Sequence, residues 1–99
     1  MKFLILQRAV PEAPVESLVR LTPEQFSYLD RLKEEGKVDL YYHMVGQQGQ
    51  MIMCDAESDE ELSRIVSQDP LFYHTKREIY PLTTPEVHKK HMREILAKR

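Results

Sequence analysis

The sequence lacks features that define several large classes of proteins. Its single cysteine, Cys54, cannot form an intramolecular disulfide, so the fold does not depend on an oxidising compartment. The apolar run from Phe3 to Leu6 is followed at once by Gln7 and Arg8, which makes it far shorter than a signal peptide's apolar segment or a membrane span. We therefore expect a cytoplasmic protein without a membrane partner.

An excess of charge of one sign is also missing. The formal net charge is −2, so no overall field attracts nucleic acid or anionic lipid. Basic residues gather only towards the C-terminus, without interleaved aromatic residues, and nucleic acid is not an expected partner. With 99 residues, 41% of them hydrophobic, the chain is the size of one globular domain that would gain stability from a partner surface.

The most informative stretch runs from Gly36 to Leu82. Val38–Val45 and Gln50–Cys54 are rich in strand-forming residues, and the Gly46-Gln47-Gln48-Gly49 segment between them supplies turn glycines, so the two runs should pair as an antiparallel hairpin. The stretch closes with a predicted strand over 72–82.

Three segments carry helix signals. Ser58-Asp59-Glu60-Glu61 matches a capping box, and the helix that it opens should end at Asp69-Pro70. Thr22-Pro23-Glu24-Gln25 is a second capping signature; it predicts a helix with Phe26, Leu29 and Leu32 on its buried stripe, closed by Gly36. Thr84-Pro85 caps a further C-terminal helix over 84–98. The segment 15–21 is either a short turn of helix or a loop.

Lys2–Val10 reads as a first strand, with large apolar residues at both parities. The resulting order, β, α, β, β, α, β, predicts an α+β ferredoxin-like fold in one domain, residues 1–99, with an antiparallel four-stranded sheet and two helices on one face. The other face carries apolar residues, so it needs a cover. A second copy is the simplest cover, which predicts a homodimer or a higher homo-oligomer.

These residues carry a family resemblance over about half of the chain. The Gly-Lys pair at 36–37, Gly46, Asp55, Ser58 with Glu61-Leu62, and above all Pro70-Leu71-Phe72 with a terminal Pro81-Leu82, resemble the muconolactone isomerase family. The resemblance implies a dimeric α+β barrel and a double-bond shift in a lactone without a cofactor. It departs from the family where the chemistry would lie, because Asp39, Leu40, His43 and Gln47 replace a set rich in Arg and His.

A weaker resemblance links Thr22-Pro23-Glu24-Gln25 and Gln68-Asp69-Pro70 to the YCII-related family, another dimeric barrel. It implies a hydrolase-like or lyase-like enzyme with a His/Asp dyad. Asp69 is present, but Gln25 stands in the place of the histidine, so the dyad cannot form.

The leading site hypothesis rests on side-chain alternation in the second strand. Tyr41 and His43 share one parity and should face the barrel interior, with Val38, Leu40 and Met44 towards the helices. His43 would transfer the proton in a 1,3-shift beside a carbonyl, and Tyr41 would donate to the developing enolate oxygen. The alternative is that His43 only caps a sheet edge.

Other polar residues complete the predicted substrate site. Arg8 shares a face with Leu4 and Leu6, so it either clamps a substrate carboxylate or lies solvated at the strand end. Tyr73 and His74 on the last strand and Gln47 in the turn are the other candidate substrate contacts. We expect no metal, because His88 and His91 lack further ligands at suitable spacing. The sequence thus predicts a cofactor-free isomerase of a small carboxylated lactone or related cyclic acid; a YCII-related enzyme and a non-catalytic ligand-binding barrel are the alternatives.

Overall fold

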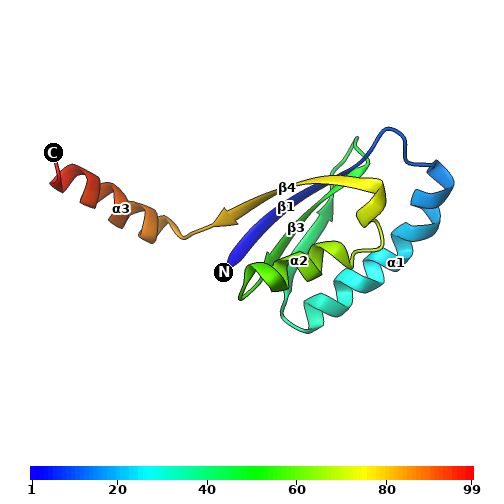
Figure 1. Ribbon diagram of the computed structural model, residues 1–99, viewed down its shortest axis with the longest axis horizontal. Helices are drawn as coiled ribbons and strands as arrows, with labels where there is room; N and C mark the ends of the chain where they lie inside the picture. The colour runs from blue at the N-terminus through cyan, green and yellow to red at the C-terminus, as the bar shows by residue number, and fades with distance from the viewer.

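The computed structural model describes all residues from 1 to 99 and contains four strands and three α-helices (Figure 1). In chain order they are β1 (Lys2–Ala9), α1 (Val15–Glu34), β2 (Val38–His43), β3 (Gly49–Asp55), α2 (Asp59–Ser67), a 3-10 turn (Phe72–His74), β4 (Thr75–Leu82) and α3 (Pro85–Ala97). The predicted order of elements is confirmed.

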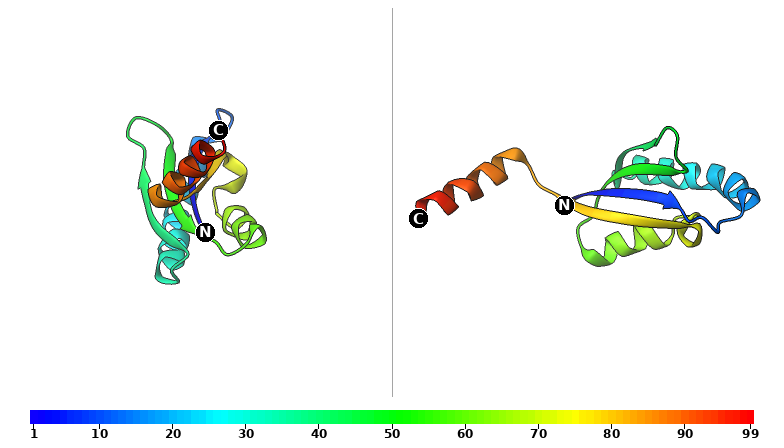
Figure 2. Two further views of the ribbon diagram at one scale, coloured as in Figure 1. Left: turned by 90° about the vertical axis from the view of Figure 1, so that its left-hand side faces the viewer. Right: turned by 90° about the horizontal axis from the view of Figure 1, so that it is seen from above.

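The strands form one antiparallel sheet in the order β2-β3-β1-β4, with β1 between β3 and β4. Helices α1 and α2 cover one face of this sheet and leave the other face open (Figure 2). This is the predicted α+β ferredoxin-like fold. The two faces are called here the helix face and the open face.

Side-chain alternation along the central strands builds the core on the helix face. Ile5 of β1 is in register with Ile52 of β3, and both are buried against Leu29 of α1 and Ile65 of α2. Cys54 lies in the same cluster, where burial raises the pKa of its thiol to about 11, so it packs as a small neutral side chain.

The predicted caps of two helices and two turns also form. Ser58 Oγ accepts from the Glu61 N–H at 3.1 Å at the start of α2, and Thr84 Oγ1 accepts from the Val87 N–H at 3.2 Å at the start of α3. Gly36 after α1 and Gly46 in the hairpin have φ of 77° and 81°, in the left-handed region that favours glycine.

Helix α1 begins earlier than its capping signature predicts. It starts at Val15 and carries Pro23 in its interior, so the predicted start at Thr22 is wrong. Thr22 Oγ1 bonds back to the Leu18 carbonyl at 2.6 Å instead of capping a new helix. Pro23 has no N–H and therefore cannot donate the helical hydrogen bond to the Val19 carbonyl. Because Val19 is exposed to water, the helix tolerates the proline at this position.

The buried stripe of α1 is also displaced from its predicted position. Gln25, Tyr28, Leu29 and Leu32 are buried, whereas Phe26 is exposed and its ring stacks at the sheet edge with its centroid 6.0 Å from that of Tyr41. The observed stripe is offset by about one residue from the predicted one, and this offset places a glutamine in the core.

A bulge in β2 reverses the predicted facing of that strand. The pairing with β3 shifts between Val38 and Leu40, so Val38 faces the helices and Leu40 faces the open side. Tyr41 consequently packs against the core on the helix face, where its hydroxyl donates to Asp30 at 2.6 Å. The prediction that Tyr41 and His43 line the open face is wrong, because a single extra residue exchanges the two faces.

Two further differences concern the C-terminal third. The predicted strand from Phe72 begins only at Thr75, because residues Phe72–His74 form a 3-10 turn. Helix α3 forms as predicted but projects away from the body (Figure 1). The radius of gyration is therefore 16.4 Å, against about 13 Å expected for a compact chain of this size. None of the helices is long and apolar enough to cross a bilayer.

Candidate functional site

Four polar side chains are buried together between the sheet and α1. They are Gln7 of β1, Gln25 of α1, Gln50 of β3 and Asp69 after α2, and none is more than 6% exposed. Each comes from a different segment of the chain. Burying polar groups in a core of this size costs free energy unless every group finds a partner.

The cluster meets this condition internally. Asp69 Oδ2 accepts from the amides of Gln7 at 3.2 Å and Gln25 at 3.0 Å, and Asp69 Oδ1 accepts from the Leu71 N–H at 2.7 Å. Gln25 and Gln50 exchange a reciprocal pair of amide hydrogen bonds. No buried side-chain nitrogen or oxygen in the chain lacks a partner.

Arg77 of β4 closes the network from the side of α2. Its Nε donates to Gln7 Oε1 at 3.2 Å, and its second terminal nitrogen donates to the Phe72 carbonyl at 3.0 Å and to Thr75 Oγ1 at 2.9 Å. Partial burial lowers the pKa of this guanidinium, although it remains charged at neutral pH. The nearby carboxylate of Asp69 opposes that shift.

A small cavity of about 80 Å³ opens beside this cluster, where the β2–β3 hairpin meets the N-terminal half of α1. Its walls combine amides and hydroxyls with a few apolar side chains: Gln7, Ala9, Leu18, Thr22, His43, Gln48, Gly49, Gln50, Leu71 and Thr75. Thr22 Oγ1 and Thr75 Oγ1 both donate to backbone carbonyls, and Thr75 Oγ1 also accepts from Arg77.

His43 is the one imidazole in this lining. It is in register with Gln50, on the helix face, and lies exposed at the cavity mouth. Tyr41 is not in the lining, and its bond to Asp30 holds it near the outer surface of α1. Burial and that hydrogen bond raise the pKa of Tyr41 to about 12, so it is a neutral phenol. The structure therefore separates the two predicted catalytic residues.

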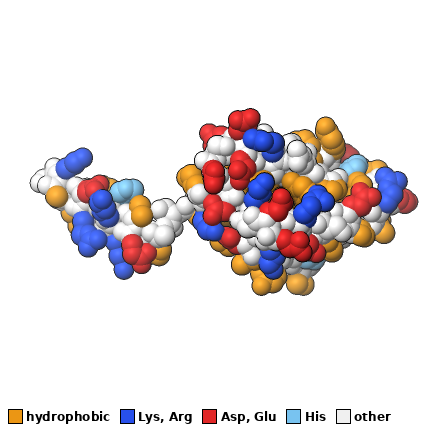
Figure 3. Space-filling model, turned by 90° about the horizontal axis from the view of Figure 1, so that it is seen from below, with side chains coloured by type: hydrophobic (Ala, Val, Ile, Leu, Met, Phe, Trp, Pro, Cys, Tyr) orange, Lys and Arg blue, Asp and Glu red, His pale blue; other side chains and the backbone are white.

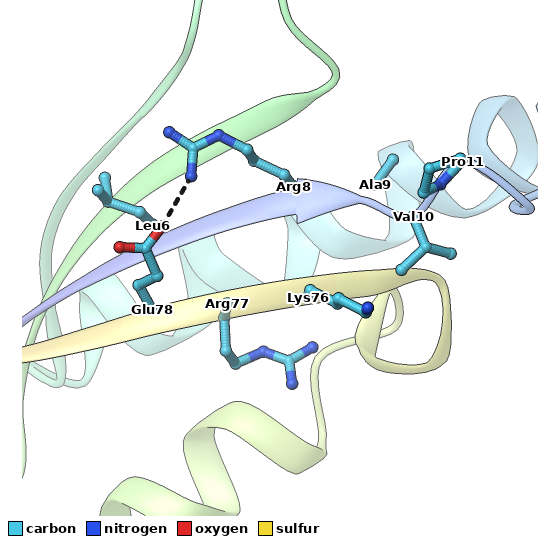
Figure 4. A pocket seen from close by; sticks show the side chains of 8 residues that line it. All are labelled: Leu6, Arg8, Ala9, Val10, Pro11, Lys76, Arg77 and Glu78. Carbon is cyan, nitrogen blue, oxygen red and sulfur yellow. Dashed lines mark hydrogen bonds and ion pairs between the residues drawn. The ribbon is translucent and has the colours of Figure 1, made fainter.

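Arg8 shares a face with Leu4 and Leu6, as predicted, and this is the open face, where Arg8 lies beside a depression of about 410 Å³ (Figure 4). Its Nε donates to Gln47 Oε1 at 3.0 Å, and a terminal nitrogen bonds Glu78 at 3.2 Å. Glu78 also accepts from the Tyr80 hydroxyl. Arg8 and Gln47 thus contact each other, but the sheet separates Arg8 from the cavity at His43.

The remaining predicted contacts lie in the 3-10 turn. Tyr73 is exposed and its ring meets that of Phe72 edge on, while His74 is half-buried. The backbone carbonyl of His74 accepts from Val10 at 3.0 Å, which ties the turn to the end of β1. Neither residue lines the cavity beside Gln50.

Sequence reasoning missed the buried glutamines. A signal was available for Gln7 and Gln50, because each stands at the buried parity of a strand that is otherwise apolar, where a polar residue needs a buried partner. Gln25 was missed because the buried stripe of α1 was predicted to include Phe26 instead of the residue before it.

Known structures resemble this chain over nearly its whole length. One is a 5-chloro-2-hydroxyhydroquinone dehydrochlorinase from Burkholderia phenoliruptrix AC1100 in complex with 2,5-dihydroxybenzoquinone, with a TM-score of 0.73 and 19% identity over 87% of this chain and 97% of that one. Another is a muconolactone isomerase, with a TM-score of 0.71 and 24% identity over 86% and 92%. These likenesses place the chain among small α+β proteins of the ferredoxin-like class.

Sequence comparison identifies the family. The model of the muconolactone delta-isomerase family matches residues 1–88. Muconolactone Delta-isomerase 1 of Acinetobacter lwoffii is 31% identical over 71 residues, which cover 72% of this chain and 74% of that protein. The chain belongs to the muconolactone delta-isomerase family.

Proposed function

We propose that this protein is a cofactor-free isomerase that moves a proton within a small lactone or related cyclic acid, bound in the cavity beside Gln50. The observation that carries the proposal is the position of His43, the one imidazole in a lining that otherwise offers amides, hydroxyls and a few apolar side chains. Membership of the muconolactone delta-isomerase family supports the same reaction class.

The reaction needs a proton carrier and a donor to the enolate oxygen. The imidazole of His43 takes a proton from a carbon beside the carbonyl and returns it two carbons away, so no atom is gained or lost. The amide groups of Gln7 and Gln50 each use one hydrogen inside the cluster, which leaves the second hydrogen of each to stabilise the oxygen. Asp69 fixes the orientation of Gln7 through its own carboxylate.

The alternative is a barrel that binds a small ligand without turnover. It is favoured by the internal hydrogen bonding of the cluster, in which every buried nitrogen and oxygen already has at least one partner. A YCII-related mechanism is less well supported, because the side chain 3.0 Å from Asp69 is the amide of Gln25, which does not exchange a proton near neutral pH.

The test compares His43→Gln with His74→Gln, a matched change at a histidine outside the cavity. Turnover of muconolactone and exchange of its protons in D2O are followed by NMR. We expect His43→Gln to lower kcat by at least about 100-fold and His74→Gln to leave it within about twofold. Equal activity of His43→Gln and the parent protein would refute the assignment. Binding of the lactone without turnover or exchange in the parent would establish the alternative.

We also propose that a second copy of the chain covers the open face. Leu4 and Leu6 of β1 lie there beside Met51 and Met53 of β3, and Tyr42 is 63% exposed at the edge. A contiguous apolar surface of this kind is typical of an interface, and a symmetric dimer would bury it in both copies at once.

A further inference from the structure

The cavity beside Gln50 is too small to enclose a whole substrate. Its volume is about 80 Å³, whereas sites for small molecules usually measure about 300–1,000 Å³. A molecule whose reacting carbonyl lies against Gln7 and Gln50 must therefore extend out of the cavity. The cavity walls show where it can go, because Leu18, Thr22 and Gln48 also line a larger groove next to it.

This groove, called here the α1 groove, has a volume of about 410 Å³ and follows the N-terminal half of α1. The helix and the β2–β3 hairpin supply its six lining residues: Val15, Leu18, Val19, Thr22, Pro23 and Gln48. The hairpin is tied to the end of β1, since the Ala9 N–H donates to the Gln48 carbonyl at 2.8 Å. The cavity and the α1 groove therefore form one continuous depression between α1 and the hairpin.

The α1 groove exposes apolar side chains that no other element covers. Val15, Leu18 and Val19 have the i, i+3, i+4 spacing of one helix face. The C-terminal half of α1 buries its stripe against the sheet, whereas Val15 is 70% and Val19 68% exposed. Hydrophobic side chains reach the surface at this end of the body, opposite α3 (Figure 3). An apolar groove that continues from a polar cavity suits a ligand with one polar and one apolar end.

The charge of the two linings decides between substituents. No lysine or arginine stands in the lining of the cavity or of the α1 groove, and Arg8 lies on the other face of the sheet. In the proposed mechanism His43 is occupied at the reacting carbons. A carboxylate in the groove would lose water without gaining a cation, whereas an alkyl chain gains free energy from each methylene that leaves water. The linings therefore favour a neutral apolar substituent.

We propose that the substrate carries a neutral hydrocarbon substituent, which lies in the α1 groove while the carbonyl meets the amide hydrogens of Gln7 and Gln50. The inference rests on the proposed function, because it takes the cavity beside Gln50 as the place of the reacting carbonyl. It adds the part of the substrate that lies outside the cavity and the side chains that select it, Leu18 and Val19 above all.

The first test measures binding without turnover. Saturated γ-lactones cannot isomerise, and three of them differ only in the γ substituent: methyl, butyl or carboxymethyl. Their dissociation constants for the full-length chain are measured by NMR titration. We expect the butyl lactone to bind at least about tenfold more tightly than the methyl lactone, because each methylene that leaves water strengthens binding by about fourfold. The carboxymethyl lactone, which matches butyl in size, should bind no more tightly than the methyl lactone.

The second test places a charge in the groove. Val19→Asp puts a carboxylate among the groove side chains, and Val45→Asp makes the same change at a valine 96% exposed in the hairpin, outside both linings. We expect Val19→Asp to weaken binding of the butyl lactone at least about fivefold and to leave the methyl lactone within about twofold. Val45→Asp should change neither. Both valines are exposed, so both variants should fold, which circular dichroism checks.

The outcomes separate this inference from the function on which it rests. Equal affinity for the butyl and methyl lactones would overturn the inference, even in a protein whose turnover of muconolactone depends on His43. A preference for butyl that Val19→Asp abolishes, in a protein that isomerises no lactone, would support the inference and refute the proposed reaction. Weaker self-association of Val19→Asp in sedimentation equilibrium, with unchanged lactone binding, would mean that a second copy covers the α1 groove and would overturn the inference.

Discussion

The two faces of the sheet use the same strands in different ways. On the helix face, apolar side chains surround a cluster of three glutamines and Asp69 whose hydrogen bonds all close within the protein. On the open face, half-buried Leu and Met side chains lie beside ion pairs at the edges, such as Arg8 with Glu78 and Lys2 with Asp39.

The difference shows how solvent access decides the role of a polar group. A buried amide or carboxylate needs fixed partners, so the helix face holds its polar groups in one arrangement beside the cavity. An exposed ion pair contributes little stability and can exchange partners with water or another chain. The helix face is therefore suited to positioning a small ligand and the open face to association.

The largest expected contrast comes from two adjacent residues of β1. Ile5→Ala removes a side chain 2% exposed on the helix face and should lower the free energy of unfolding by about 2–5 kcal/mol. Leu4→Ala, on the half-buried open face, should cost clearly less in dilute solution. Urea denaturation at several protein concentrations measures both.

This pair also tests the proposed cover of the open face. If a second copy packs there, the cost of Leu4→Ala should grow with protein concentration, because the parent gains stability on association. A cost independent of concentration, in a chain that sediments as a monomer, would show that the open face is not an interface.

A smaller effect is expected from Asp69→Asn, which keeps the shape of the side chain. The new amide would direct hydrogens at groups that already donate, which are the amides of Gln7 and Gln25 or the Leu71 N–H. The expected loss of stability is about 1–3 kcal/mol. Asp59→Asn, on the exposed first turn of α2, is the matched control, with an expected loss of about 0.3–1 kcal/mol. Equal losses would mean that the buried network contributes nothing of its own.

The smallest contrast concerns Tyr41 and Tyr42, neighbours on opposite faces. Burial, with the bond to Asp30, raises the pKa of Tyr41 to about 12 from an ordinary value of 10.0. Its contribution to stability is therefore complete below pH 10 and is lost as the pH rises towards 12. Tyr41→Phe should therefore reduce the loss of stability that the parent protein shows over this alkaline range. Part of the loss should remain, because the pKa of Tyr28 is also raised to about 12.

Tyr42→Phe is the control, because this side chain is exposed on the open face. Phenolate absorbance, followed during a pH titration of each variant, shows which tyrosine ionises late. If Tyr41→Phe and Tyr42→Phe gave the same titration curve, the assignment of Tyr41 to the helix face would be contradicted.

Local signals in the sequence predicted much of this structure. The caps at Ser58 and Thr84 and the glycines at 36 and 46 act within a few residues, so the order of elements followed from them, and with it the fold. The motif from Pro70 to Phe72 pointed to the family that the comparisons identify. The same local logic failed at Pro23, because packing over the length of α1 outweighed one capping signature.

The candidate site was harder to predict from the sequence, because its residues come from segments that are far apart in the chain. Gln7 and Asp69 are 62 positions apart in the sequence and meet only across the folded core. Alternation correctly placed Arg8 with Leu4 and Leu6, but it placed Tyr41 and His43 on the wrong face. One bulged residue between Val38 and Leu40 moves the later side chains of β2 to the opposite face of the sheet, and no residue around it indicates a bulge.

The sequence by itself determined where the strands, helices and turns form and which family the chain belongs to, because those depend on neighbouring residues and on short motifs. Only the tertiary structure decided which groups share a cavity, which tyrosine is buried and where α3 points. Those properties depend on strand register and helix packing, which join residues far apart along the chain.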